Sequence, residues 1–376
     1  MMILTDDQRM LQDVVRPFMA EEGAIKAQLR HWRDARCKDG FGHGLWKQLA
    51  ELGLTGVLIP EHAGGAGLGQ VEANLVLEEI GRNLTPSPFL TTSVATVRAL
   101  EGSAQAERWF PGIVAGETVA ALAIDEGKSH NPVATALEAK RQGNGFVLNG
   151  QKQFVVHGAS ADVLVVAART AGAAGETKGV TLFAVPRDTA GVDVENVALA
   201  DSSKAARLTL ADVAVDADAV IGEVDEGWAP LSRALGAGRA GAASELVGIA
   251  AGASKLTFDY LKQRKQFGRL IGEFQALQHR AAHLYGEIEI ARAVTMKAAQ
   301  LVDVGDPRAD VLTAVAKAKA GKVARLAVQE GVQMHGGIGM TDEHDIGLYM
   351  KRQAVLDELF GGPRFHAGEV ARISGY

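Results

Sequence analysis

Residues 356–366 have the sequence LDELFGGPRFH, in which one predicted helix ends and another begins. Good helix formers lead into Phe360, and Gly361, Gly362 and Pro363 follow before helical sequence resumes. Glycine favours the left-handed conformation that ends a helix, and proline suits the first turn of the next one. The simplest interpretation is a stop and a restart. The alternative is that a bend kept free of side chains borders a ligand.

The composition predicts a protein with two or three subdomains. The chain has 376 residues, 47% of them hydrophobic, and no segment approaches the length of an apolar membrane span. A single cysteine, Cys37, argues against a disulfide framework or a cysteine-rich metal site. The net charge of −6 argues against nucleic-acid binding. The acidic, amphipathic start is unlike a signal or transit peptide, so we expect a soluble, cytoplasmic protein.

Outward from the bend, the hydrophobic period divides the chain into three predicted domains. Residues 1–116 have helical spacing, with Thr5 able to cap the first helix, and residues 117–227 have the period of two that is typical of strands. In the middle domain, the Asn149–Gly150 pair predicts a hairpin turn. Residues 228–376 contain long helical runs that could form a four-helix bundle. The expected class is α+β, with an antiparallel β domain between two helical domains.

Two glycine-containing motifs in the C-terminal domain could bind a phosphate or a flat ring. RKQFG, residues 264–268, places cations at the end of a long predicted helix, where they could complement the helix dipole or engage a phosphate. QMHGGIGM, residues 333–340, follows a predicted helix rather than a strand, so it does not fit a Rossmann fingerprint. Its glycines suit a helix end or a close approach to a ligand.

Two further groups have plain alternatives. The residues TDEHD, 341–345, are contiguous and lack the i, i+4 histidine pair of a zinc helix, so we expect a solvated turn and no metal. His157 follows a predicted strand and could act as a general base, but a hydrogen-bonded loop histidine is the simpler interpretation.

Taken together, these pieces closely resemble the acyl-CoA dehydrogenase family. The resemblance is carried by RKQFGRLIGEFQALQH, by VQMHGGIGMTDEHDIGLYMKR and by LNGQKQFVV, and it covers essentially the whole chain. It implies an N-terminal helical domain, a middle β domain and a C-terminal four-helix bundle. It also implies that a glutamate removes the α-proton of an acyl-CoA thioester while the β-hydride passes to FAD. Family members are normally tetramers whose FAD sites borrow residues from a neighbouring chain.

The resemblance assigns cofactor contacts to specific residues. Arg264 and Gln266 match positions near the FAD pyrophosphate, and Gln333, Gly336 and Gly337 match the loop on which the adenosine end rests. The resemblance also implies contacts from the aromatic and amide residues Phe267, Phe274 and Gln275.

The half of the FAD site that the chain would supply itself departs from the family pattern. Ile124 stands where a threonine is usual, and His130 lies near the usual serine, with Ser129 beside it. A tryptophan-x-threonine run is replaced by residues 154–156, in which Phe154 could pack on a flavin ring but Val156 offers no donor.

The usual places for the proton-abstracting glutamate are vacant. Gly361 occupies one of them, and Gly238, beside Arg239, occupies the other. Arg239 could pair with a distal carboxylate of the substrate or orient the site. Glu245 lies two helical turns beyond Gly238 among small residues, so it could be the base, or a structural ion-pair partner, or this chain has no base. Asp357 and Glu358 are weaker candidates, because charged residues before a bend usually face water.

These departures are similar to the smaller chain of two-subunit acyl-CoA dehydrogenases that act on pimeloyl-CoA or steroid side chains. The first hypothesis is a flavin-dependent dehydrogenase chain, active as a homotetramer or with a larger paralogous subunit. The second is a non-catalytic subunit that completes a partner's FAD site, and the third is a cofactor-free acyl-CoA-binding scaffold. Family analogy suggests an electron-transfer flavoprotein as the electron acceptor. The acyl chain cannot be inferred from the sequence.

Overall fold

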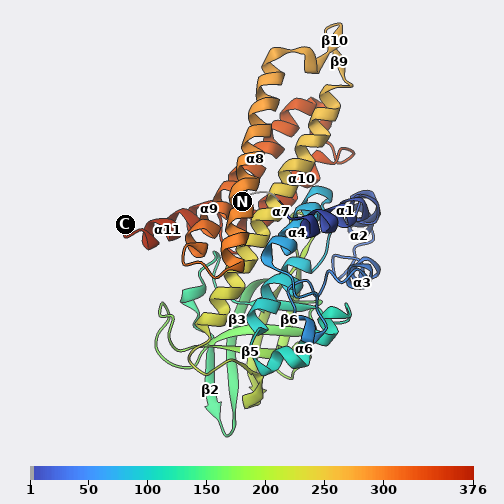
Figure 1. The fold of residues 1–376 in the computed structure, drawn as a ribbon. Helices are drawn as coiled ribbons and strands as arrows, with labels where there is room; N and C mark the ends of the chain where they lie inside the picture. The colour runs from blue at the N-terminus through green and yellow to red at the C-terminus, as the bar shows by residue number, and fades with distance from the viewer. Residues whose placement is uncertain (1–3) are drawn as a thin grey trace. The chain divides into compact units, whose positions relative to one another are not determined.

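The computed structural model describes residues 4–376, which form two compact units. A helical unit contains residues 4–31, 70–86 and 239–376, and a mixed unit contains residues 32–69 and 87–238. The long helix α7, Trp228–Leu261, contributes residues to both. The elements follow the predicted order of helices, strands and helices, so the α+β class is confirmed (Figure 1).

The helical unit is built from long helices joined by short connections. Besides its part of α7, its elements are α1 (Asp6–Glu21), η1 (Lys26–Arg30), α4 (Gln70–Asn83), β9 (Lys265–Gln266), β10 (Arg269–Leu270), η6 (Ile271–Glu273), α8 (Gln275–Asp303), α9 (Ala309–His335), η7 (Gly336–Met340), α10 (Ile346–Glu358) and α11 (Pro363–Ile373). Thr5 caps α1 as predicted, accepting from the Gln8 amide in a capping box. Figure 1 shows the β9–β10 hairpin at the point where α7 turns into α8.

Glycines bring α4 and α7 into backbone contact. A Cβ on Gly248 would lie 2.0 Å from the Glu78 carbonyl oxygen, and one on Gly81 would lie 2.0 Å from the Glu245 carbonyl oxygen. Any side chain at these two positions would force the helices apart. This close packing fixes the part of α7 that carries Glu245.

The mixed unit contains all of the larger sheet. Its helical elements are α2 (His31–Asp34, at the boundary), α3 (His43–Glu51), η2 (Glu61–Ala63), η3 (Leu90–Thr96), α5 (Val97–Leu100), α6 (Ala104–Val114), η4 (Pro132–Ala134) and η5 (Ala217–Ala219). Its strands are β1 (Ala120–Ala123), β2 (Glu138–Gln142), β3 (Gly145–Val156), β4 (Val163–Arg169), β5 (Val180–Pro186), β6 (Val192–Ala198), β7 (Lys204–Val215) and β8 (Val220–Ile221). The strand order is β6-β7-β3-β2-β4-β5-β8, with β1 paired to β4.

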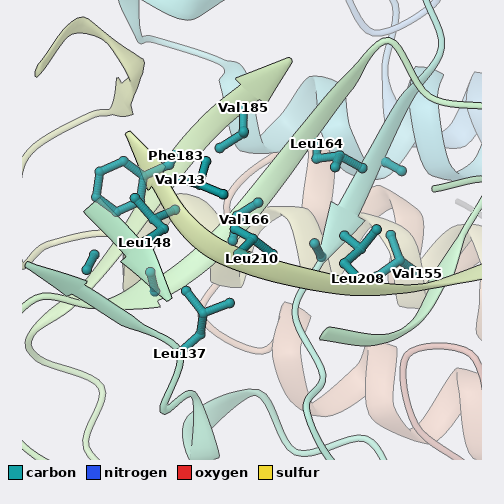
Figure 2. Close-up of a cluster of buried hydrophobic side chains, with 14 of the residues drawn as sticks. Leu137, Leu148, Val155, Leu164, Val166, Phe183, Val185, Leu208, Leu210 and Val213 are labelled. Carbon is teal, nitrogen blue, oxygen red and sulfur yellow. The ribbon is translucent and has the colours of Figure 1, made fainter. Parts of the chain in front are cut away.

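The sheet is mostly but not wholly antiparallel, because β4 pairs in parallel with β1 and, at one position, with β2. Its core is a cluster of buried, mostly aliphatic side chains that also includes Phe146 and Phe183 (Figure 2). The side chains of β4 are all buried, whereas those of β7 alternate between buried and exposed along much of the strand. That alternation is the period of two that the sequence showed.

The predicted hairpin turn at Asn149–Gly150 is wrong. Both residues lie inside β3, at a register shift against β7, and the chain turns instead between β2 and β3, at residues 143–144. Gly150 has φ +145°, and a Cβ there would lie 2.9 Å from the Leu137 side chain. Asn149 exchanges two hydrogen bonds with Asp212 of β7. The glycine signal therefore marks a β-bulge, which also prefers this residue type.

The RKQFG segment also differs from the expectation. It does not end the long helix, because α7 stops at Leu261, and residues 264–270 form the exposed hairpin of β9 and β10. Since dipole effects fall off beyond the last turn, complementing the helix dipole is the weaker explanation for Arg264. The predicted domain boundaries at 116 and 227 stay a prediction.

Candidate functional site at the Phe360–Pro363 bend and the cofactor loops

The bend between α10 and α11 is a stop and restart of unusual geometry. Phe360 has φ +60° and Gly361 has φ +101°, so two successive residues are left-handed and one of them is a bulky aromatic. Such strain in a non-glycine residue persists only where the surroundings fix it, and it often marks a functional segment. Phe360 is buried, with 4% of its surface exposed.

The Phe365 ring covers Gly361. A Cβ on Gly361 would lie 2.4 Å from Cδ1 of Phe365 and 3.0 Å from its Cγ. Real Cβ atoms do not come so close to ring carbons, so no side chain fits at residue 361 while the ring stays in place. At the position that the resemblance assigns to the family's glutamate, this chain therefore has a glycine, and the Phe365 ring fills the space of its side chain.

A fully buried lysine holds the bend in place by hydrogen bonds to its backbone. The Nζ atom of Lys317, on α9, donates to the carbonyl oxygens of Leu356 at 3.2 Å, Asp357 at 2.9 Å and Gly361 at 3.2 Å. Burial lowers the pKa of Lys317 to about 8, against the opposing influence of Asp357 and Glu358. Lys317 thus supplies hydrogen bonds to carbonyl oxygens that lack an acceptor role within the helix at the end of α10.

Asp357 does not face water, which corrects the expectation for this residue. It is 1% exposed, and its Oδ2 accepts from Arg325 at 2.8 Å, whereas Glu358 is exposed as expected. A Cβ on Gly321 would lie 2.1 Å from the other carboxylate oxygen of Asp357, so glycine makes room for this carboxylate.

Glu245 is held in a buried ion pair. It is 2% exposed, and its Oε1 accepts from Nε of Arg352 at 2.9 Å and from the terminal nitrogen Nη2 at 2.6 Å. The sequence predicted small, apolar neighbours for this carboxylate, and Arg352 was missed because it lies on α10, 107 residues away. The guanidinium partner fixes the orientation of the carboxylate through charge-assisted hydrogen bonds.

Arg239 belongs to the same part of the helical unit as the bend. Its guanidinium carbon lies 5.4 Å from the centre of the Phe365 ring, within the range of a cation–π contact. Phe365 therefore contacts both Gly361 and Arg239. The ring therefore lies beside one of the two vacant base positions that the sequence indicated, Gly361.

The predicted cofactor residues of the hairpin are exposed. Arg264, Gln266 and Gln275 are exposed, and Phe267 is 90% exposed with φ +54°. Phe274 is partly buried and lies under the Arg269 guanidinium, 4.1 Å from ring centre to carbon. The exposed guanidinium and amide donors of this segment suit an anionic ligand.

The second predicted cofactor segment is equally open. Gln333, Gly336 and Gly337 are exposed, and a Cβ on either glycine would meet nothing within 4 Å among the described residues. The chain itself therefore does not require glycine at residue 337, whereas Gly336 has φ +64°. A ligand or neighbouring chain that approaches this loop would explain why residue 337 is a glycine. The exposed donors of the two segments and the bare glycines of this loop fit FAD.

Three rings in contact support this loop, and the sequence did not indicate this arrangement. The ring centres of Tyr260 and His335 are 4.6 Å apart, and those of His335 and His344 are 4.2 Å apart. Burial lowers the pKa of both histidines. The only signal in the sequence was the presence of both histidines in the QMHGGIGM and TDEHD motifs.

In the mixed unit, the loop after β1 is rigidly held. The fully buried Lys152 donates to the Ile124 carbonyl at 2.9 Å and to Glu126 at 2.6 Å, and burial lowers the pKa of Lys152. Asp125 pairs with Nδ1 of His130 at 2.8 Å. The loop with the unusual residues is therefore an ordered structure.

The altered strand end in the mixed unit is also well defined. Phe154 has φ +53° at a bulge between β3 and β7 and is partly exposed, whereas Val156 is buried. His157 is 8% exposed and hydrogen-bonds Thr91 at 3.0 Å, which fits the simpler interpretation of a loop histidine. The partial exposure of Phe154 is compatible with the aromatic contact that the resemblance implies.

Within residues 4–376, no group of three or more histidine, cysteine or acidic side chains converges as a metal site would. In the same part of the chain, no helix is both long enough and apolar enough to cross a membrane.

The chain belongs to the acyl-CoA dehydrogenase family. The family's N-terminal domain matches residues 5–117, its middle domain residues 124–213 and its C-terminal domain residues 225–372. Members of this family are FAD-dependent oxidoreductases that act on acyl-CoA thioesters, so FAD is the cofactor and acyl-CoA the substrate class.

Known relatives cover nearly the whole chain. Cyclohex-1-ene-1-carbonyl-CoA dehydrogenase of Syntrophus aciditrophicus is 31% identical over 96% of this chain and 87% of its own. Butyryl-CoA dehydrogenase of Megasphaera elsdenii has a TM-score of 0.89 at 26% identity, over 99% of both chains. The Tcur3481-Tcur3483 steroid ACAD has a TM-score of 0.88 at 30% identity, over 98% of both chains.

Proposed function

We propose that this chain is one subunit of a heteromeric acyl-CoA dehydrogenase in which a paralogous chain supplies the proton-abstracting carboxylate. The observation that carries the proposal is the Phe365 ring at the place of a side chain on Gly361. The second vacant position, Gly238, is followed by Arg239, a cation that cannot remove a proton at neutral pH. The buried ion pair of Glu245 supports its structural role over its role as base.

When bound, FAD supplies the acceptor for the hydride that leaves the β-carbon of the thioester. We assign its phosphates to Arg264 and Gln266, and its adenosine end to Gln333, Gly336 and Gly337. The exposed donors and the open glycine loop support this assignment.

The remaining assigned cofactor contacts are aromatic or amide groups. Phe267, Phe274, Gln275 and Phe154 complete the set. In family members the groups of the hairpin and of the 333–337 loop serve a neighbouring chain's cofactor, whereas Phe154 belongs to the half that the chain supplies itself, so we infer that the hairpin and loop of this chain complete the partner's site. Arg239 would act as a positioning residue, held by Phe365.

The electron acceptor and the partner chain are proposed by analogy with relatives. A solved structure of the electron transferring flavoprotein of Acidaminococcus fermentans includes a chain 28% identical to this one, with a TM-score of 0.90. We therefore propose an electron-transfer flavoprotein as electron acceptor. The two-chain name of the steroid ACAD relative supports a paralogous partner. The cytoplasmic location stays a prediction.

A second candidate is a homotetramer that uses Glu245 as its base. The observation in its favour is that Glu245 is a buried carboxylate in the same helical unit as the bend. This second candidate requires the Arg352 guanidinium to release the Glu245 carboxylate during turnover.

Co-purification tests the proposal. The chain is tagged in its native host, and the purified material is examined for a second acyl-CoA dehydrogenase chain, for FAD and for oxidation of a butyryl-CoA and hexanoyl-CoA panel with a dye acceptor. The proposal expects a flavin-containing assembly with a paralogue that carries a glutamate at a family base position. An active homotetramer without a paralogue would contradict it and favour Glu245.

A further inference from the structure

The contacting rings of Tyr260, His335 and His344 join three segments of the helical unit. Tyr260 is near the end of α7, His335 is the last residue of α9, and His344 lies in the connection from η7 to α10. His335 is 3% exposed, and its Nδ1 donates to the Gly331 carbonyl at 2.7 Å. The rings therefore lie directly beside the loop formed by residues 336–345.

His344 also accepts a hydrogen bond from the first residue of the helix that follows. The Ile346 amide, at the first residue of α10, donates to Nδ1 of His344 at 3.3 Å. This bond requires an unprotonated Nδ1, so the neutral ring carries its proton on Nε2. Protonation of Nδ1 would remove the acceptor and place a positive charge at a helix N-terminus, where the macrodipole opposes it.

The charged groups around His344 do not readily accommodate a second cation. Arg30 of η1 binds Asp345 at 2.7 Å and Asp342 at 3.6 Å, so the two nearest carboxylates already have a partner. Glu343, also on the loop, is exposed. Burial is the main cause that lowers the pKa of His344, His335 and Arg30 lower it further, and the Asp345 carboxylate acts in the opposite direction.

We propose that neutral His344 is the positioning residue of the 336–345 loop, and that its protonation loosens the loop and weakens binding of the anionic dinucleotide. This inference rests on the proposed function, in which the loop holds the adenosine end of FAD. It adds a specific residue that links cofactor retention to pH. His335 contributes by filling the space beside His344 with an uncharged ring.

The sign of the effect follows from the lowered pKa. The folded protein holds the His344 proton less tightly than the unfolded chain does, so the neutral form is favoured on folding. The loop is thus held most firmly at pH values above the ordinary pKa of histidine. His344 stops supporting the loop as the pH falls below about 6.5 and through the pKa of His344 in the folded protein.

The test compares FAD binding by the protein in its native assembly at two pH values. His344→Asn keeps an oxygen that can accept from the Ile346 amide but cannot titrate. His344→Ala removes both features, and His43→Asn, on the exposed His43 of α3, is the matched control. Equilibrium dialysis with flavin fluorescence gives the dissociation constant without any need for turnover.

The expected result is a different pH profile for each protein. Between about pH 7.5 and about pH 5, the FAD dissociation constant should rise roughly tenfold in the wild type and in His43→Asn, but less than about threefold in His344→Asn. His344→Ala should bind weakly at both pH values. Parallel profiles for the wild type and His344→Asn would overturn the inference. Absence of FAD binding at about pH 7.5 in every protein would instead contradict the proposed function.

Discussion

The ring of Phe365 and the backbone of Gly361 exclude any side chain at residue 361, since a Cβ there would lie 2.4 Å from Cδ1 of the ring. Gly361 is also left-handed, at φ +101°, which disfavours every other L-residue. The loss of a base at this place is therefore built into the local structure. It follows that a single substitution should not restore the family's usual glutamate.

Gly361→Glu alone is expected to unfold the bend or displace Phe365, and to lower the free energy of unfolding by about 2–4 kcal/mol. Gly361→Glu combined with Phe365→Ala should recover part of this loss, because the second change removes the clashing ring. Denaturant titration of both variants and of Phe365→Ala measures the coupling. Additive effects would show that the ring does not restrict residue 361.

Glu245→Gln should leave turnover of the native assembly within about threefold of the wild type, because the base is proposed to lie on another chain. It should destabilise the chain by about 3 kcal/mol, since Arg352 loses its buried counter-charge. Arg352→Gln provides the matched half of a double-mutant cycle. Loss of turnover with unchanged stability and FAD content would identify Glu245 as the base and contradict the proposal.

Arg264→Ala should weaken FAD retention by about 1.5–3 kcal/mol, through the loss of a charge-assisted hydrogen bond to a phosphate. The exposed Arg308 serves as the control position, because it pairs only locally with Asp306 in the connection from α8 to α9. The measurement is flavin content after gel filtration of each assembly. Equal FAD content in Arg264→Ala and Arg308→Ala would refute the cofactor role of the hairpin.

Lys317→Met should lower the free energy of unfolding by about 2–4 kcal/mol at neutral pH, because buried carbonyls at the bend lose their donor. Lys322→Met, at an exposed lysine of the same helix, should change it little. Thermal or denaturant unfolding of both variants provides the comparison. Similar losses in the two variants would show that Lys317 does not anchor the bend.

The difference in free energy of unfolding between the wild type and Lys317→Met should depend on pH with a definite sign. The unfolded chain keeps the Lys317 proton up to its ordinary pKa of 10.5, whereas the folded chain loses it near 8. The unfolded state therefore binds more protons between these values, and wild-type stability should rise relative to Lys317→Met across that window. The difference is measured by denaturant titration at several pH values. If the stability difference between the wild type and Lys317→Met became smaller over this pH range, the inference that buried Lys317 loses its proton more easily than an exposed lysine would be contradicted.

Gly248→Ala should destabilise the helical unit by about 1–3 kcal/mol, because the added methyl group meets the Glu78 carbonyl of α4. Gly368→Ala is the control, since its Cβ meets nothing within 4 Å and alanine is the better helix former. Calorimetry of both variants tests the packing. A neutral Gly248→Ala would mean that the two helices can separate without loss.

The sequence predicted the order of elements, the α1 cap and the family, because these depend on periodicity and contiguous motifs. It misplaced the hairpin turn, since an Asn–Gly pair suits both a tight turn and a β-bulge, and only strand pairing distinguishes them. It could not find Arg352 beside Glu245, Lys317 under the bend or Phe365 over Gly361. Each of these contacts depends on how side chains fit around the bend and between packed helices.

The most direct test of the central claim is the flavin content and native mass of this chain purified alone and together with its co-expressed paralogue. The account predicts that the chain alone holds little FAD and does not oxidise butyryl-CoA or hexanoyl-CoA. With the paralogue, it should form a flavin-containing assembly that oxidises at least one acyl-CoA. A yellow homotetramer of this chain alone, with its flavin reduced by an acyl-CoA, would contradict the account.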